Sequence, residues 1–310
     1  MSSTRLELSV QHETRYDYAA PVSLAHHLLH LRPLVDVHQD LLQFDLNVTP
    51  RPNQLQDGGD VFGNACSHFT ISQPHEYLLV RSSSRVRVAP RFALMDAARS
   101  PAWETVRDRL RYVARQGFDG AVEFVQPSPY VPRLAALREF IAPSFPAAAP
   151  IALAAIELMH RVYSGFTYRS RSTDIDTPLE QAFLQRTGVC QDFAHVMLGC
   201  LRMLGLPARY VSGYLLTHSS DDGHAMAGAD ASHAWVQVWV PDTPGVPANG
   251  WLDLDPTNDV IPGTDHVRVA VGRDYGDVVP LRGVIRGGGK HTLAVAVTTR
   301  VVSPAQSLQA

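Results

Sequence analysis

A helix that opens on a cysteine is the feature that most constrains this chain. Cys190 follows Gly188 and directly precedes apolar residues at helical spacing, and the run ends at Gly205 and Pro207. The first turn of a helix carries partial positive charge and free backbone N–H groups, which stabilise a thiolate and can bind an oxyanion. The pattern therefore predicts a buried helix with a nucleophile at its start. Its apolar positions are Phe193, Ala194, Met197, Leu198, Leu201 and Leu204.

Two later segments supply the partners that a nucleophilic cysteine needs. Residues 233–240 alternate between two faces, which predicts a strand that starts at His233. A second short strand is predicted at 251–255, with Asp253 and Asp255 on the same face. If the two strands pair in antiparallel fashion, the histidine lies beside the end of the second strand, and either aspartate can orient the imidazole. Thiol, imidazole and carboxylate are the parts of nucleophilic acyl transfer.

Each of these residues alone has a simpler interpretation, because single cysteines and histidines are more often structural than catalytic. Their joint occurrence favours an enzyme over a binding module. Three cysteines with no CxxC pair argue against a disulfide framework and a structural zinc site. A histidine cluster at His26, His27 and His30 falls on a predicted strand, so we expect core or surface side chains there. We expect no metal and no cofactor.

Length and charge exclude several classes of function. The chain has 310 residues, of which 45% are apolar and 18% charged, as in ordinary globular proteins. A net charge of -3 provides no basic field for nucleic acid. The first residues lack the apolar core of a signal peptide, and no apolar run reaches the length of a membrane span. We expect a cytoplasmic protein that binds neither nucleic acid nor membrane.

Periodicity divides the chain into four parts. Residues 1–95 predict a β-sandwich-like domain, and residues 96–163 predict helices separated by prolines. Residues 164–262 hold the cysteine, histidine and aspartate segments, and residues 263–310 add C-terminal strands that complete the fold. The polar, glycine-containing loop 217–231 joins two predicted strands of the site. It is either a lid or a plain connector.

At these residues the chain resembles the transglutaminase-like superfamily of papain-like cysteine enzymes. Five short motifs occur in the order of that family, namely Phe166-Thr167-Tyr168, Gly188-Val189-Cys190, Pro207 to Tyr214, His233-Ala234-Trp235 and Asp255 to Asn258. The leading region also resembles the N-terminal β domain of bacterial members, in His12 to Tyr18, Pro21-Val22, Leu31-Arg32-Pro33 and Phe62-Gly63-Asn64. The resemblance covers nearly the whole chain, more weakly between about 90 and 160 and after 262.

The resemblance implies an α+β fold, in which the helix bearing the cysteine packs on an antiparallel sheet. It also implies a triad of Cys190, His233 and Asp255, because the aspartate of the family directly precedes Pro-Thr. Papain-like enzymes often add an upstream side-chain donor for the oxyanion. The further candidates for the oxyanion site and the cleft are Gln185, Gln181, Tyr168 and Trp235.

Family catalysis proceeds through a thioester. Water then releases an acid, as in a peptidase or amidase, or an amine takes the acyl group, as in cross-linking. We expect a cysteine hydrolase that acts on amide bonds of peptides or proteins. The alternatives are a true protein-glutamine gamma-glutamyltransferase and a catalytically silent binding or scaffold protein. The N-terminal domain is a candidate site for a protein partner.

Overall fold

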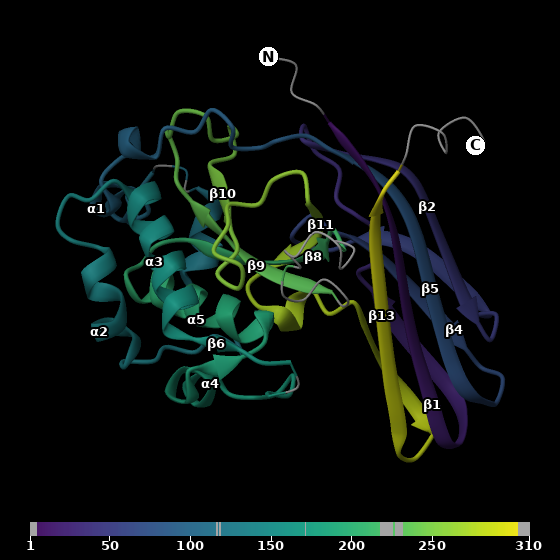
Figure 1. Cartoon of the computed structure of the whole chain (residues 1–310). Coiled ribbons are helices and arrows are strands. Elements are labelled where there is room, and N and C mark those ends of the chain that lie inside the picture. The colour runs from purple at the N-terminus through teal and green to yellow at the C-terminus, as the bar shows by residue number, and fades with distance from the viewer. Residues whose placement is uncertain are drawn as a thin grey trace.

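The protein has an α+β architecture, as predicted. The computed structural model describes residues 5–115, 117, 119–170, 172–217, 226 and 232–302. A strand-rich domain stands beside a second domain in which helices pack on a smaller antiparallel sheet (Figure 1). Among the described residues, no helix combines the length and the apolar character needed to cross a membrane.

The strand-rich domain is built around one long strand, β1 (Leu6–Leu29). All seven strands of its sheet pair in antiparallel fashion, and the pairing of β1 shifts register between Asp17 and Val22. Before this irregularity β1 pairs with β5 and β13, and after it mainly with β4 and β12. The sheet therefore turns over its own apolar core, in which Val22, Phe69 and Leu78 are buried. The other strands of the N-terminal half are β2 (Gln39–Thr49), β3 (Gln54–Gly59), β4 (Ala65–Ile71) and β5 (His75–Val88).

The C-terminal strands divide between the two sheets. β11 (His266–Gly272) belongs to the second domain, whereas β12 (Leu281–Gly287) and β13 (His291–Val301) pair with β1. Consecutive glycines with positive φ, Gly287 to Gly289, form the turn between β12 and β13. Strands from the N-terminal and C-terminal regions thus share one sheet, and β13 runs beside β1 next to the second domain (Figure 1).

Helix α5 is the centre of the second domain. Every residue of α5 from Asp192 to Arg202 is buried. Apart from α3, the helices around it are short, because prolines interrupt the preceding region. The α-helices are α1 (Trp103–Arg109), α2 (Leu137–Ile141), α3 (Ile151–Gly165), α4 (Leu179–Gln185) and α5 (Cys190–Met203). The 3-10 helices among the described residues are Ala97–Arg99, Gly120–Val125, Ala142–Ser144 and Tyr275–Asp277.

Helix α5 packs on a four-stranded antiparallel sheet in the order β10-β9-β8-β11. Its strands before β11 are β8 (Ala208–Leu215), β9 (His233–Trp239) and β10 (Trp251–Leu254). In the β9–β10 pair, Leu254 lies opposite Val236. Asp255, the next residue, therefore falls near the His233 end of β9. The two strands thus pair in antiparallel fashion, which is the condition under which the sequence places an aspartate beside His233.

Two amide side chains of the strand-rich domain dock it onto the edge of β11. Asn64 donates to the carbonyl of Val271 at 2.7 Å and accepts the N–H of the same residue at 2.8 Å. Gln39 likewise donates to the backbone carbonyl of Arg268 at 2.8 Å and accepts the backbone N–H of Arg268 at 2.9 Å. Both amides are completely buried and stand where the backbone of a further strand would pair. These contacts fix how the strand-rich domain lies against the second domain.

Candidate active site

Cys190 is the first residue of α5 and is partly buried. Asp192, in the first turn, accepts the backbone N–H of Val189 at 2.8 Å and the hydroxyl of Thr173 at 2.6 Å. Asp192 therefore caps the helix. A Cβ at Gly188 would lie 2.5 Å from Oδ2 of Asp192, so this position needs the close approach that glycine permits. The carboxylate of Asp192 thus stabilises the turn that precedes Cys190.

His233 and Asp255 form an ion pair that excludes water. Nε2 of His233 lies 2.9 Å from Oδ2 of Asp255, and neither side chain is exposed. Burial acts to lower the pKa of His233, but Asp255 and Cys190 outweigh burial and raise it to about 10. The pKa of Asp255 is lowered, because the imidazolium outweighs the effect of burial. With Nε2 bound to the carboxylate, Nδ1 is the nitrogen left for the cysteine, which lines the same cleft.

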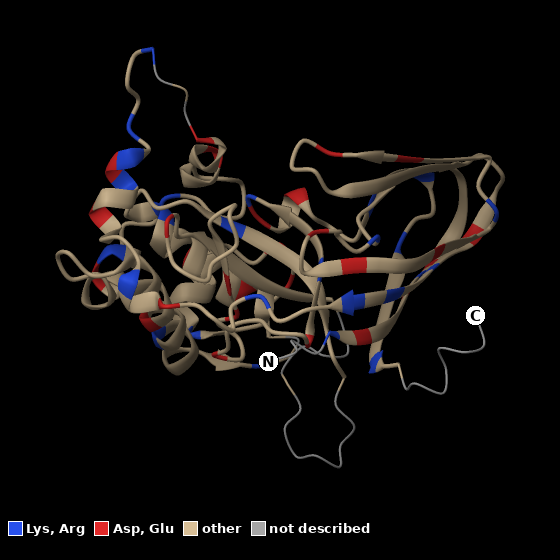
Figure 2. Cartoon of the chain, turned by 90° about the horizontal axis from the view of Figure 1, so that it is seen from above, with Lys and Arg blue, Asp and Glu red and all other residues tan. Residues whose placement is uncertain are grey.

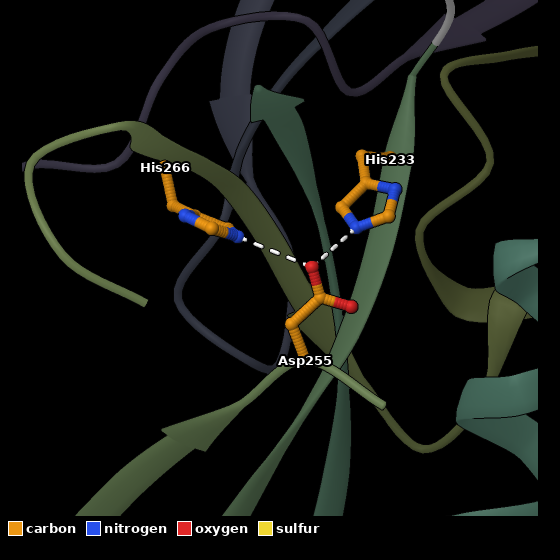
Figure 3. A group of neighbouring side chains, drawn as sticks. All are labelled: His233, Asp255 and His266. Carbon is orange, nitrogen blue, oxygen red and sulfur yellow. Dashed lines mark hydrogen bonds and ion pairs between the residues drawn. The ribbon is translucent and has the colours of Figure 1, made fainter. Parts of the chain in front are cut away.

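The carboxylate of Asp255 is held on both oxygens. Oδ1 accepts the backbone N–H of Thr257 at 2.9 Å, and Oδ2 accepts the side-chain amide of Asn258 at 2.8 Å. A second imidazole, His266, places Nε2 3.3 Å from the same Oδ2 (Figure 3). His266 was not predicted, because it lies on a later strand outside the short motifs. Its other nitrogen lies 2.7 Å from Oδ1 of Asp265.

The donor atoms of His233, Asp255 and His266 all lie within 4.8 Å of one another, which is close enough to consider a metal ion. Their nitrogen and oxygen atoms already face each other at 2.9 and 3.3 Å. A bound metal would displace the bond that orients His233. We therefore assign this cluster as a hydrogen-bond network.

Asp253 has a different partner from Asp255. It accepts the indole N–H of Trp235 at 2.9 Å, and its other oxygen lies 4.0 Å from Arg268. The sequence left both aspartates open as partners of the imidazole, and the structure pairs only Asp255 with it among the described residues. The prediction that Trp235 lines the cleft is wrong, because the indole is fully buried behind β9 in an apolar cluster with Val211.

A cleft of about 560 Å³ opens at Cys190 and His233. Tyr168 lines it, as predicted. The strand-rich domain forms its opposite wall through Tyr16 on β1 and Leu293 on β13. Among the described residues, the lining contains no Lys, Arg, Asp or Glu side chain. The other lining residues are His12, Thr14, Tyr130, Ser170, Ile175, Val189, Gln191, Tyr210, Ser212, Ser232, Ala234, Tyr275, Val279, Pro280, Leu281 and Val295.

The structure corrects the predicted oxyanion donors. Gln185 and Gln181 lie exposed on α4 and do not line the cleft. Gln191 does line it, beside the cysteine, although its amide donates to the carbonyl of Ile175 at 2.9 Å. Tyr210 is a second lining residue that sequence reasoning missed; burial raises its pKa well above the usual value, so the phenol stays a neutral donor.

Three further features concern neighbours of the site. His195 is buried, its pKa is lowered to about 3 by burial, and it accepts the N–H of Tyr275 at 3.2 Å, as a core residue does. Cys200 is fully buried and burial raises its pKa, in accord with an unreactive thiol. Most of the loop predicted as a lid or a connector, residues 218–225 and 227–231, lies outside the described residues.

A helix-borne cysteine, an antiparallel sheet and a buried imidazole–carboxylate pair define a papain-like arrangement. The comparisons with known proteins give the family. Residues 142–256 match the family described as the transglutaminase-like superfamily, and residues 8–87 match the bacterial transglutaminase-like N-terminal region. The chain belongs to the transglutaminase-like superfamily.

Two relatives share most of their length with this chain, and a third shares only a segment. An uncharacterized protein of Mycobacterium tuberculosis (strain H37Rv) is 39% identical over 289 residues, which cover 92% of this chain and 89% of that protein. An uncharacterized protein of Mycobacterium leprae is 33% identical over 296 residues, 94% and 97% of the two chains. A protein-glutamine gamma-glutamyltransferase of Pseudomonas aeruginosa is 34% identical over 128 residues, 37% of this chain but only 17% of that protein.

The whole fold has also been observed in a solved structure. A protein of Cytophaga hutchinsonii, described as a candidate cysteine protease, aligns with a TM-score of 0.74 at 20% identity. The alignment covers 97% of this chain and 92% of that one. Both domains and their mutual arrangement therefore recur together.

Proposed function

We propose that this protein is a cysteine enzyme that cleaves or transfers amide acyl groups, with hydrolysis, as in a peptidase or amidase, favoured over transfer. Cys190 is the nucleophile, His233 carries the proton and Asp255 orients His233. The observation that carries the proposal is the water-excluded contact of 2.9 Å between His233 and Asp255, beside a cysteine at a helix start in an open cleft. A purely structural role for His233 would not explain why it both lines the cleft and pairs with a buried carboxylate.

The geometry supports a two-step reaction. The thiolate of Cys190 attacks the amide carbonyl carbon, while N–H groups at the start of α5 stabilise the oxyanion. The imidazolium of His233 then gives its proton to the departing amine nitrogen, which leaves a thioester. In the second step His233 takes a proton from water, whose oxygen attacks the thioester and releases the acid.

The cleft supports an uncharged polypeptide segment as the acyl donor. Apart from Cys190 and His233, its described lining is aromatic, aliphatic or neutral polar, and His12 stays neutral because burial lowers its pKa to about 4. A charged side chain of the substrate would lose its hydration in this cleft without gaining an oppositely charged partner. Lys and Arg are interspersed with Asp and Glu over both domains, which supports a protein substrate over nucleic acid (Figure 2). The cytoplasmic location and a protein partner of the N-terminal domain stay predictions.

The second candidate is transfer of the acyl group to an amine. The Pseudomonas aeruginosa relative, which is named a glutamyltransferase and matches 37% of this chain, favours it. The two reactions share the thioester and differ in the acceptor, so the same triad serves either one. A catalytically silent scaffold is the third reading, and it requires an unreactive Cys190.

Labelling of Cys190 with iodoacetamide, followed by mass spectrometry across pH, tests the proposal. We expect fast labelling below pH 7 in the wild type and none at this position in Cys190→Ala. In His233→Ala the labelling should require higher pH, because the imidazolium that stabilises the thiolate is gone. Labelling that is as slow as that of an ordinary thiol and independent of His233 would favour the scaffold.

Incubation with glutamine-containing peptides, with and without a primary amine, then separates the two enzymes. Release of acid and ammonia or of a shorter peptide indicates a hydrolase. Amine incorporation in preference to hydrolysis indicates the transferase.

A further inference from the structure

His266 is held between two carboxylates. Its Nε2 lies 3.3 Å from Oδ2 of Asp255, and its Nδ1 lies 2.7 Å from Oδ1 of Asp265. An ionised carboxylate only accepts hydrogen bonds, and a neutral imidazole has a single N–H to donate. Both contacts can be hydrogen bonds together only when the ring carries two N–H groups. Ionised carboxylates on both sides therefore favour the imidazolium form of His266.

His266 is buried between the two carboxylates, which stabilise a positive charge on its ring. Its side chain is completely buried, whereas Asp265 is about one-third exposed at 34%. Burial acts to lower the pKa of His266, and the bonds to Asp255 and Asp265 outweigh burial and raise it. The rings of Trp235 and His266 pack at nearly a right angle, with centroids 5.2 Å apart.

Two other charged groups face this site. Arg91 donates to the backbone carbonyl of His266 at 3.3 and 3.4 Å, so its guanidinium contacts the main chain of the residue rather than the ring. His233 lies on the far side of Asp255, with ring centroids of the two histidines 6.2 Å apart. Two carboxylates thus alternate with two imidazoles, in a chain that runs from Asp265 at the surface to the cleft.

We propose that His266 is a positioning residue of the active site: as an imidazolium it fixes the carboxylate of Asp255 and limits how strongly that carboxylate holds the proton of His233. The inference rests on the function proposed above for Cys190 and His233. The charge of His266 follows from its contacts with Asp255 and Asp265 and does not depend on that function.

Two effects follow from this arrangement. The bond from His266 restricts rotation of the Asp255 carboxylate, whose Oδ2 also faces His233 (Figure 3). The positive charge also opposes protonation of His233. At 6.2 Å between ring centroids and an effective dielectric constant of about 20, loss of this charge raises the pKa of His233 by about 1 to 2 units. His266 thereby keeps the proton of His233 transferable at moderately alkaline pH.

Nitrogen-15 NMR of the histidine rings tests the charge directly, because imidazolium and neutral imidazole nitrogens have distinct chemical shifts. In the full chain we expect both nitrogens of His266 to report an imidazolium at pH 7.5. Asp265→Asn, which changes only a partly exposed side chain, should lower the pH at which His266 loses its proton. A neutral His266 ring at pH 7.5 in the wild type would overturn the proposal whether or not the protein is an enzyme.

His266→Gln tests the effect on His233. We expect the NMR titration of His233 to move up by about 1 to 2 pH units. The alkaline limb of peptide turnover should move in the same direction. His30→Gln is the matched control, because it removes a buried imidazole 3.4 Å from Asp60 in the strand-rich domain, and it should shift neither profile.

An unchanged His233 titration in a folded His266→Gln variant would reduce His266 to a structural residue and overturn the proposal. If this variant does not fold, the Asp265→Asn measurement decides, since an unaltered His266 titration there contradicts the proposed clamp. If peptides are not turned over at all, the NMR titrations still decide the inference, and the labelling of Cys190 separately decides the proposed function.

Discussion

The indole N–H of Trp235 donates to Oδ1 of Asp253 at 2.9 Å, and this bond separates the roles of two aspartates on one strand face. Asp253 and Asp255 are both completely buried. Asp253 stabilises the packing behind β9, whereas Asp255 lies beyond the end of β10 and faces His233. One carboxylate thus belongs to the core and the other to the site.

Isosteric replacement of each aspartate tests this division. Asp255→Asn removes the charge that holds the imidazolium, so the pKa of His233 should fall, because burial then dominates. We expect turnover and iodoacetamide labelling at pH 7 to drop at least about tenfold. Asp253→Asn keeps an acceptor for the indole of Trp235, so we expect nearly normal labelling. Because the charge that faces Arg268 is lost, we expect the free energy of unfolding to fall by about 1–3 kcal/mol. Equal losses of labelling in the two variants would contradict the assignment.

The helix and the strands of the site were predictable because their signals are local. Apolar spacing after Cys190 gave the buried helix, and alternation after His233 gave the strand that packs beneath it. The pairing of Asp255 with His233 required only that two neighbouring strands run antiparallel. Local periodicity and a single pairing rule were sufficient for this part.

Other parts of the site depend on contacts between distant segments, which periodicity does not record. His266 reaches Asp255 from a different strand, and Leu293 reaches the cleft from the last strand of the chain. The burial of Trp235 also follows from a tertiary contact, since alternation places the indole on the same face as His233. Alternation thus places Trp235 on the correct face of β9 but does not show that its side chain is buried away from the cleft.

The stability of the fold should vary with pH through the same pair. The pKa of His233 is raised from 6.5 to about 10, so its contribution is complete below about pH 6.5 and is lost as pH rises through about 10. The pKa of Asp255 is lowered from 3.8, so its contribution is present above that value and is lost as pH falls below it. The wild type should therefore exceed Asp255→Asn in unfolding free energy most clearly between about pH 4 and 6.5. Urea titrations from pH 3 to 10.5 check this, and a gap independent of pH would refute it.

Docking of the two domains should depend on Asn64. Asn64→Ala leaves the N–H and C=O of Val271 without the partners that the amide now provides. A buried backbone group without a partner costs about 1–3 kcal/mol. We expect the midpoint of thermal unfolding to fall by several degrees and the cleft to lose its fixed wall. Asn53→Ala is the control, because Asn53 also bonds to the main chain, at Ser72, but is exposed within the strand-rich domain. Equal shifts in the two variants would show that the docking bonds add nothing.

A negative charge on β13 tests whether the strand-rich domain contacts the substrate. Leu293 lines the cleft and is 47% exposed, so Leu293→Asp should fold and place a carboxylate in a wall that is otherwise neutral among the described residues. An uncharged peptide that lies against this wall would lose apolar contact, and KM should rise roughly tenfold. The rate of Cys190 labelling by iodoacetamide should stay the same, because that reagent needs no contact with β13. Val284→Asp on the neighbouring strand β12 is the control, since Val284 is 75% exposed and lies outside the cleft lining. A KM that does not change in Leu293→Asp would confine substrate binding to the second domain. A lower KM for lysine-containing peptides would show that the new carboxylate contacts the substrate directly.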